Sequence, residues 1–239
     1  MASNRRAFLT ATTVGALAGA PTTTAGPVTT TASPVTATTP VARPRPRPRP
    51  PVTARSALAE LLTGNRRYAS GHSSHPHEER ARRRLLSAGQ QPFAVIVGCI
   101  DSRVPPELVF DQGLGDLLCI RTAGQVLDGA VLGSVQYGVE ELHVPLVLVL
   151  GHERCGAVAA TLDHLRSGAR VPGHLRLLVN EIAPAARRTR SLPGDWLDHT
   201  VRAHALRVRD AIRADPAFRP AHVAAARFDL DTGLVSLLP

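Results

Sequence analysis

The sequence predicts an α/β fold with a mostly parallel central sheet, flanking helices and an antiparallel hairpin at the C-terminal edge. Three continuous apolar runs of strand length, at residues 92–98, 117–123 and 144–150, predict this class. Strands that are buried on both faces of a sheet have unbroken runs of this kind. Because helical segments alternate with these runs, the strands are expected to pair in parallel.

The N-terminal half of the folded part contains two predicted helices. The first spans residues 54–69 and ends at the polar stretch SGHSSHPHEE, whose histidines we assign to a loop rather than to a metal site. The second lies between residues 127 and 142, where apolar residues recur at intervals of three and four. Such a stripe is typical of a helix that packs on a sheet. Its members are Leu132, Val135, Val139 and Leu142.

The C-terminal part begins with two basic helices, predicted over residues 174–190 and 196–214. The final segment, HVAAARFDLDTGLVSLL, predicts a hairpin that turns around Asp231, Thr232 and Gly233. Residues 55–239 are therefore expected to form one domain, which is a common domain size.

The first 20 residues have the layout of an export signal. The pair Arg5 and Arg6 precedes a short apolar run that ends in Ala18, Gly19 and Ala20. This run is shorter than the roughly 20 residues that span a bilayer, so no permanent membrane span is expected. Residues 21–54 are rich in Thr, Pro and Arg and predict a disordered linker, because such a composition cannot bury enough apolar surface to fold.

The net charge of +9 does not indicate a nucleic-acid-binding protein. Six of the arginines lie in the predicted signal and linker, and only 3% of the residues are aromatic. The three cysteines are an odd number, which argues against a disulfide framework even in an exported protein.

Two cysteines and a histidine follow the predicted strands in a pattern that indicates a metal site. Cys99 comes directly after the first apolar run, His152 follows the third, and Cys155 lies where the next helix is expected to begin. If the two strands are neighbours, these side chains meet at one edge of the sheet. A helix N-terminus is also expected to lower the pKa of the Cys155 thiol. Two sulfurs and one nitrogen suit zinc, and three protein ligands leave a position for water, as in catalytic zinc sites.

The stretch CIDSR places Asp101 and Arg103 beside this predicted site. The carboxylate could accept a hydrogen bond from a zinc-bound hydroxide or ligate the metal, and the arginine could hold it away. Each cysteine alone is more often a buried packing residue, and Cys119 keeps that interpretation. A phosphatase-like cysteine nucleophile is not favoured, because the loop after Cys99 lacks the glycines that bind phosphate.

These motifs together resemble the β-class carbonic anhydrases. The resemblance rests on the CIDSR stretch followed about fifty residues later by HERC, and it extends over most of the folded part. It implies one Zn²⁺ per chain bound by Cys99, His152 and Cys155, with Asp101 and Arg103 as a catalytic pair that controls the fourth position. The implied reaction is the reversible hydration of carbon dioxide to bicarbonate and a proton by zinc-bound hydroxide.

The resemblance also implies that Gln90 contacts the substrate and that Tyr137 lines the pocket, at an interface between subunits of a homodimer or larger homo-oligomer. The paired arginines resemble a twin-arginine-type signal, which implies export in a bacterium to the periplasm, the cell surface or the medium. Two alternatives remain open at this point. One is a hydrolase of a related linear substrate such as carbon disulfide, and the other is a non-enzymatic zinc-containing surface protein.

Overall fold

The computed structural model describes residues 53–239. The predicted export signal and nearly all of the predicted linker, residues 1–52, lie outside the described residues. Within the part that the structure describes, no helix combines the length and apolar character needed to cross a membrane.

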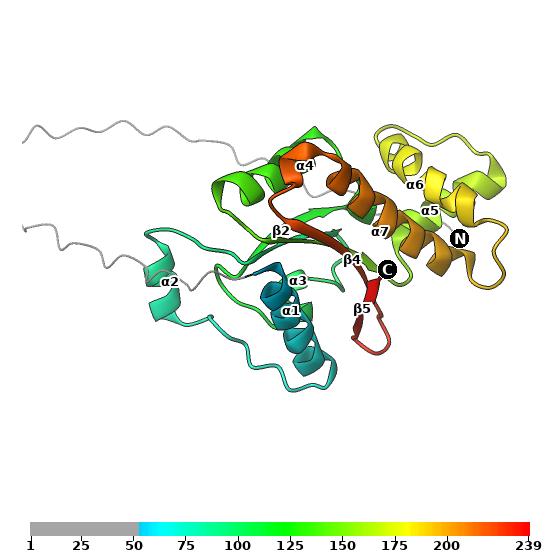
Figure 1. The fold of residues 1–239 in the computed structure, drawn as a ribbon. Helices are drawn as coiled ribbons and strands as arrows, with labels where there is room; N and C mark the ends of the chain where they lie inside the picture. Colours follow the sequence, from blue (N-terminus) through cyan, green and yellow to red (C-terminus); the bar gives the residue numbers. More distant parts are fainter. Residues whose placement is uncertain (1–52) are drawn as a thin grey trace, which may run out of the picture. The chain divides into compact units, whose positions relative to one another are not determined.

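A five-stranded sheet forms the centre of the domain, in the order β2-β1-β3-β4-β5 (Figure 1). The pairs β1–β2, β1–β3 and β3–β4 are parallel, and β4–β5 is antiparallel. The α/β class and the C-terminal edge hairpin are therefore confirmed. The strands are β1 (Ala94–Cys99), β2 (Leu117–Thr122), β3 (Leu146–His152), β4 (His222–Phe228) and β5 (Val235–Leu238).

Strands β1 and β3 are direct neighbours, as the predicted metal site requires. Val95 pairs with Val147 and Gly98 with Leu150 in the parallel register. Every residue of both strands is buried, which explains their unbroken apolar sequence. The carboxyl ends of the two strands consequently meet at the same edge of the sheet.

The helices flank the sheet on both faces (Figure 1). The predicted helix at 127–142 is in fact α4 followed by a π-helical turn, η2, in which the N–H of Leu142 reaches the carbonyl of Tyr137. The helices are α1 (Ala54–Ala69), α2 (Arg80–Leu86), α3 (Pro106–Val109), α4 (Gly129–Gln136), α5 (Gly156–Ser167), α6 (Leu175–Thr189) and α7 (Trp196–Ala214), and the short turns are η1 (Ala123–Gln125), η2 (Tyr137–Glu141) and η3 (Pro216–Phe218).

Alternate residues of each strand pack into different layers of the core. Val95 and Val97 of β1 belong to one apolar cluster with residues of α4 and α7. Ala94 and Ile96 belong to a second cluster with residues of α1 and α3. This division follows from the alternation of side chains along a strand. A third cluster lies where α5, α6 and α7 meet the strand ends, and it contains Cys99 and Cys155.

Candidate metal centre

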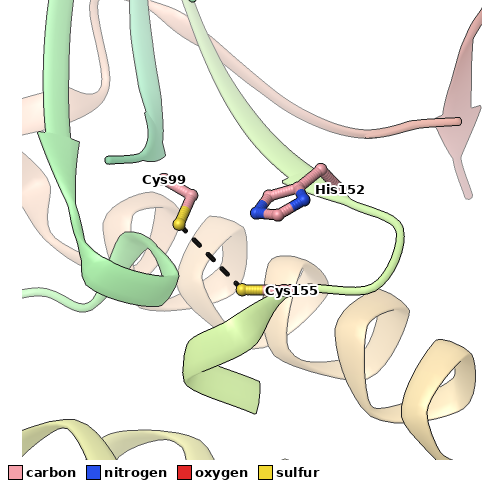
Figure 2. Close-up of side chains that lie close together, drawn as sticks. All are labelled: Cys99, His152 and Cys155. Carbon is pink, nitrogen blue, oxygen red and sulfur yellow. Dashed lines mark hydrogen bonds between the residues drawn. The ribbon is translucent and has the colours of Figure 1, made fainter. Parts of the chain in front are cut away.

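Three potential metal ligands converge at the carboxyl ends of β1 and β3. Cys99 is the last residue of β1, His152 is the last residue of β3, and Cys155 directly precedes α5. Their ligand atoms all lie within 4.8 Å of one another, and the two Sγ atoms are 4.0 Å apart (Figure 2). All three residues are buried, with exposed fractions of 6%, 0% and 1%.

The imidazole of His152 is oriented for ligation through Nε2. Its Nδ1 lies 2.9 Å from the carbonyl oxygen of Glu153. Because a carbonyl oxygen can only accept a hydrogen bond, Nδ1 carries the proton and Nε2 presents its lone pair. This Nε2 is buried and has no hydrogen-bond partner among the described residues. An unpaired buried acceptor is costly, so a lone pair held beside two sulfurs fits a metal ion.

The two thiols share a hydrogen bond that changes their acidities in opposite directions. Contact with Cys155 is the main cause that lowers the pKa of Cys99. His152 and then the N–H of Gly124, which lies 3.3 Å from Sγ, add to this effect. The same contact, together with burial, raises the pKa of Cys155. The expected lowering by the start of α5 is present at Cys155, but the pKa of the thiol as a whole is raised. The backbone N–H groups that begin α5 do lower it, but the sulfur of Cys99 and burial outweigh them.

Asp101 and Arg103 form a close ion pair beside the cluster. Arg103 donates from Nε and Nη2 to the two carboxylate oxygens of Asp101, at 2.9 and 2.7 Å. This contact holds the pKa of the Asp101 carboxyl well below its usual range. The carboxylate also lies near the cluster, because its Oδ2 is 3.8 Å from Nε2 of His152. The predicted pair thus lies next to the three ligands, with both of its oxygens directed toward arginine.

Sequence patterns did not identify Arg121 as part of this site. Arg121 lies in β2 and donates from Nε to the carbonyl of Cys99, at 2.8 Å, and from Nη2 to the carbonyl of Asp101, at 2.6 Å. It therefore holds the backbone of the loop that carries Asp101. A single arginine within the apolar run 117–123 was the available signal, because a buried strand rarely contains an unpaired charge.

A cavity of about 570 Å³ opens beside Cys99 and Asp101. Its walls come mainly from α5 and α6 and are largely apolar. Besides Cys99 and Asp101, three charged or titratable side chains also line it, namely Asp163, His164 and Arg170. The apolar lining residues include Ile100, Ala157, Ala160, Leu175, Leu178 and Val179. A small apolar molecule could therefore reach the cluster from this side.

Gln90 and Tyr137 do not join the cluster within one chain. Gln90 is exposed and lines a different hollow, together with Leu86 and Gly115. Tyr137 begins η2 and is 53% exposed. Neither residue lines the cavity beside Cys99. Their contact with substrate therefore stays a prediction.

A second group of potential ligands, Glu153, Asp229 and Asp231, lies near the β4–β5 turn. Arg154 pairs with Asp231 at 2.6 Å, and Arg227 pairs with Asp229 at 2.9 Å. These arginines compensate the negative charge, so the group needs no cation. The Cys-His-Cys cluster is thus the stronger candidate among the described residues.

Comparison with known proteins identifies the family. A sequence model described as carbonic anhydrase matches residues 94–235, which is more than half of the chain. The chain belongs to the carbonic anhydrase family. The matched region begins with β1 and ends in β5, so it contains all three potential ligands and the Asp101–Arg103 pair.

Two curated carbonic anhydrases show the extent of the similarity. Carbonic anhydrase 2 of Mycobacterium tuberculosis is 50% identical over 135 residues, which are 56% of this chain and 64% of that protein. The carbonic anhydrase of Mycolicibacterium smegmatis is 49% identical over 135 residues, with the same coverage of both chains. The chain thus spans a little less than two thirds of the length of these relatives.

Solved structures of β-carbonic anhydrases share the fold. The β-carbonic anhydrase CcaA matches with a TM-score of 0.60 and 24% identity, over 76% of this chain and 95% of that one. The β-carbonic anhydrase of Coccomyxa matches with a TM-score of 0.59 and 24% identity, over 76% and 86%. At this level of identity the similarity establishes the fold alone.

Proposed function

We propose that this protein is a zinc-dependent carbonic anhydrase that reversibly hydrates carbon dioxide to bicarbonate and a proton. The observation that carries the proposal is the convergence of two buried sulfurs and the unpartnered Nε2 of His152 beside an apolar cavity. Relatives of the chain at about 50% identity are named carbonic anhydrases, which supports the same activity here.

In this proposal Cys99, His152 and Cys155 hold one zinc ion per chain. Two thiolates and one imidazole are typical zinc ligands, and three protein ligands leave one position of a tetrahedral site open. Zinc bound there would supply Lewis-acid chemistry, which lowers the pKa of a coordinated water from about 15.7 toward roughly 7. The negative charge of the two sulfurs weakens this effect relative to a site of three neutral histidines.

Asp101 and Arg103 are proposed to orient the reacting water. Oδ2 of the ionised Asp101 carboxylate lies 3.8 Å from Nε2 of His152. From there it can accept a hydrogen bond from a water molecule beside this imidazole. Arg103 donates to both oxygens of Asp101, and this contact is proposed to keep the carboxylate from taking the open position of the metal. The apolar wall of the cavity accepts carbon dioxide, which has no net charge and no hydrogen to donate.

A homodimer or larger homo-oligomer is proposed to complete the site. In such an assembly, Gln90 and Tyr137 from a second copy contact the substrate and line the pocket. Their exposure, away from the cavity of their own chain, is consistent with this role. One structural neighbour is described as tetrameric β-carbonic anhydrases of Sordaria macrospora, with a TM-score of 0.56 and 23% identity over 76% of this chain and 96% of that one.

We also propose that the protein is exported from a bacterial cell through its twin-arginine-type signal. The proposal rests on the order of paired arginine, short apolar run and small residues within residues 1–20.

The deciding experiment measures bicarbonate formation by the purified protein in a stopped-flow assay, together with its zinc content. Catalysis that scales with bound zinc is the expected result. Full activity in a metal-free sample would overturn the mechanism. Turnover of carbon disulfide without hydration of carbon dioxide would replace the proposed substrate.

The hydration rate is expected to rise with pH above about 7, where the reacting water loses its proton. The pKa of Asp101 is lowered, so this carboxylate is ionised at every pH above its depressed value. It therefore contributes no titration near neutrality, and the Arg103 contact persists across the range measured. Stopped-flow rates at constant zinc content test this, and a rate that stays flat from acidic to alkaline pH contradicts it.

A further inference from the structure

The turn that touches Cys99 has a backbone conformation that needs external support. Gly124 and Gln125 are consecutive residues of η1 with positive φ values of 66° and 45°. The N–H of Gly124 points to Sγ of Cys99 at 3.3 Å. Glycine adopts many backbone conformations at low cost, and a non-glycine residue with positive φ is strained. The direction of this N–H therefore depends on contacts from outside the turn.

His204 of α7 supplies one such contact, from 80 residues further along the chain. Its Nε2 lies 2.9 Å from the carbonyl oxygen of Gly124, and its side chain is buried. Because the carbonyl can only accept, Nε2 carries the proton and Nδ1 does not. Burial lowers the pKa of His204 to about 4, so the ring is neutral near pH 7.

The other ring nitrogen of His204, Nδ1, is a polar atom that is seldom left unpaired in a protein core. Nδ1 is buried and has no hydrogen-bond partner among the described residues. A leucine or methionine at this position would avoid an unpaired acceptor in the core. Within residues 53–239, the hydrogen bond of this side chain to Gly124 is the contact that offsets this cost.

We infer that His204 is a positioning residue for the metal ligand Cys99, acting through Gly124. The inference rests on the proposed function in one respect, namely that Cys99 binds zinc. His204 fixes the carbonyl of Gly124, and the N–H of the same residue then donates to the sulfur. A hydrogen bond to a thiolate stabilises it as a ligand, and residues that support metal ligands commonly change metal affinity by 10–100-fold.

Close packing around Gly124 leaves little room for another arrangement of the turn. A Cβ atom at Gly124 would lie 2.9 Å from Cδ1 of Ile182 and 3.1 Å from Cβ of Ala157. These residues belong to α6 and α5. The turn is thus confined between two helices on one side and is anchored by His204 of α7 through its carbonyl. Loss of the anchor frees the peptide group between Gly124 and Gln125. Rotation about the backbone bonds of Gly124 then passes the change to the N–H that faces Cys99.

The experiment compares zinc affinity in three variants of the full chain. His204→Leu removes the donor, His204→Gln keeps an N–H donor, and Thr200→Val is the matched control. Thr200 is also buried in α7, and its hydroxyl lies 3.0 Å from that of Thr189 and donates to the carbonyl of Trp196 at 2.8 Å. Competition with a chelator gives the zinc dissociation constant. Substitution with Co²⁺ gives the sulfur-to-cobalt charge-transfer absorption, which reports on the thiolate ligands directly.

His204→Leu is expected to weaken zinc binding by about 10–100-fold and to shift the cobalt absorption. His204→Gln should recover most of the affinity, and Thr200→Val should stay within about twofold of the parent protein. Wild-type affinity and absorption in His204→Leu would overturn the inference, as would an equal loss in Thr200→Val. If His204→Leu does not fold, His204→Met makes the same comparison.

The outcome is separable from that of the proposed activity. A parent protein that binds zinc and shows the expected pattern, but does not hydrate carbon dioxide, refutes the activity and leaves the role of His204 intact. If the parent protein hydrates carbon dioxide and His204→Leu binds zinc as tightly as the parent does, only the role of His204 is refuted. Failure of the parent protein to bind zinc refutes both.

Discussion

Cys99→Ser is expected to abolish both zinc binding and the hydration of carbon dioxide. Cys99 is 6% exposed and supplies one of two sulfurs in the cluster. A serine hydroxyl is not ionised near neutral pH, so it replaces a thiolate with a neutral and weak ligand. Because changes in supporting residues already cost 10–100-fold in metal affinity, loss of a direct ligand should cost more than about 100-fold. Zinc content per chain and stopped-flow rates measure the two effects.

Cys119→Ser is the matched control for this prediction. Cys119 lies in the neighbouring strand β2 and is not part of the Cys-His-Cys cluster. Burial raises the pKa of its thiol, so it is an un-ionised packing residue. The same chemical change at this position should leave zinc content and rate within about twofold, with at most a modest loss of stability. Equal losses in both variants would mean that folding, rather than ligation, explains the effect at Cys99.

Asp101→Asn is expected to reduce the hydration rate by about 100-fold or more while zinc remains bound. The substitution preserves the size of the side chain but removes its charge and one acceptor oxygen. Arg103 then loses the bidentate contact at 2.9 and 2.7 Å, and the reacting water loses its proposed acceptor. The rate and the zinc content must be measured on the same sample. A normal rate would contradict the proposed role, and a parallel loss of zinc would assign Asp101 to metal binding instead.

Asp231→Asn provides the control, because Asp231 also forms a bidentate pair with an arginine. Its oxygens lie 2.6 and 2.9 Å from the guanidinium of Arg154. This pair is exposed and does not line the cavity beside Cys99. Breaking an exposed ion pair generally costs little stability, so the rate should stay within about twofold. A comparable loss in this variant would indicate a general electrostatic effect.

The apolar patterns of the sequence were sufficient to predict the sheet and most of its helices. Continuous runs predicted β1 and β3 because a strand covered on both faces has no polar alternation. The run that predicted β2 forms a half-buried edge strand instead. The predicted metal site required β1 and β3 to be neighbours in the sheet. The parallel pairing of Val95 with Val147 confirms that they are. The short helices α2 and α3 were not predicted, since they contain too few residues to establish a period. The residues of η2 lay within the predicted helix at 127–142, but apolar spacing did not reveal their π-helical turn.

The amino-acid sequence was enough to predict the fold class and to group Cys99, His152 and Cys155 as ligands of one metal site. Both predictions use local properties, namely the apolar runs and the residue types at the strand ends. Only the tertiary structure revealed that Arg121 and His204 support the loop and turn around Cys99. These contacts join residues from different elements, and no local period or spacing encodes them. The rise in the pKa of the Cys155 thiol likewise depends on a sulfur that is 56 residues distant in the chain and 4.0 Å away in space.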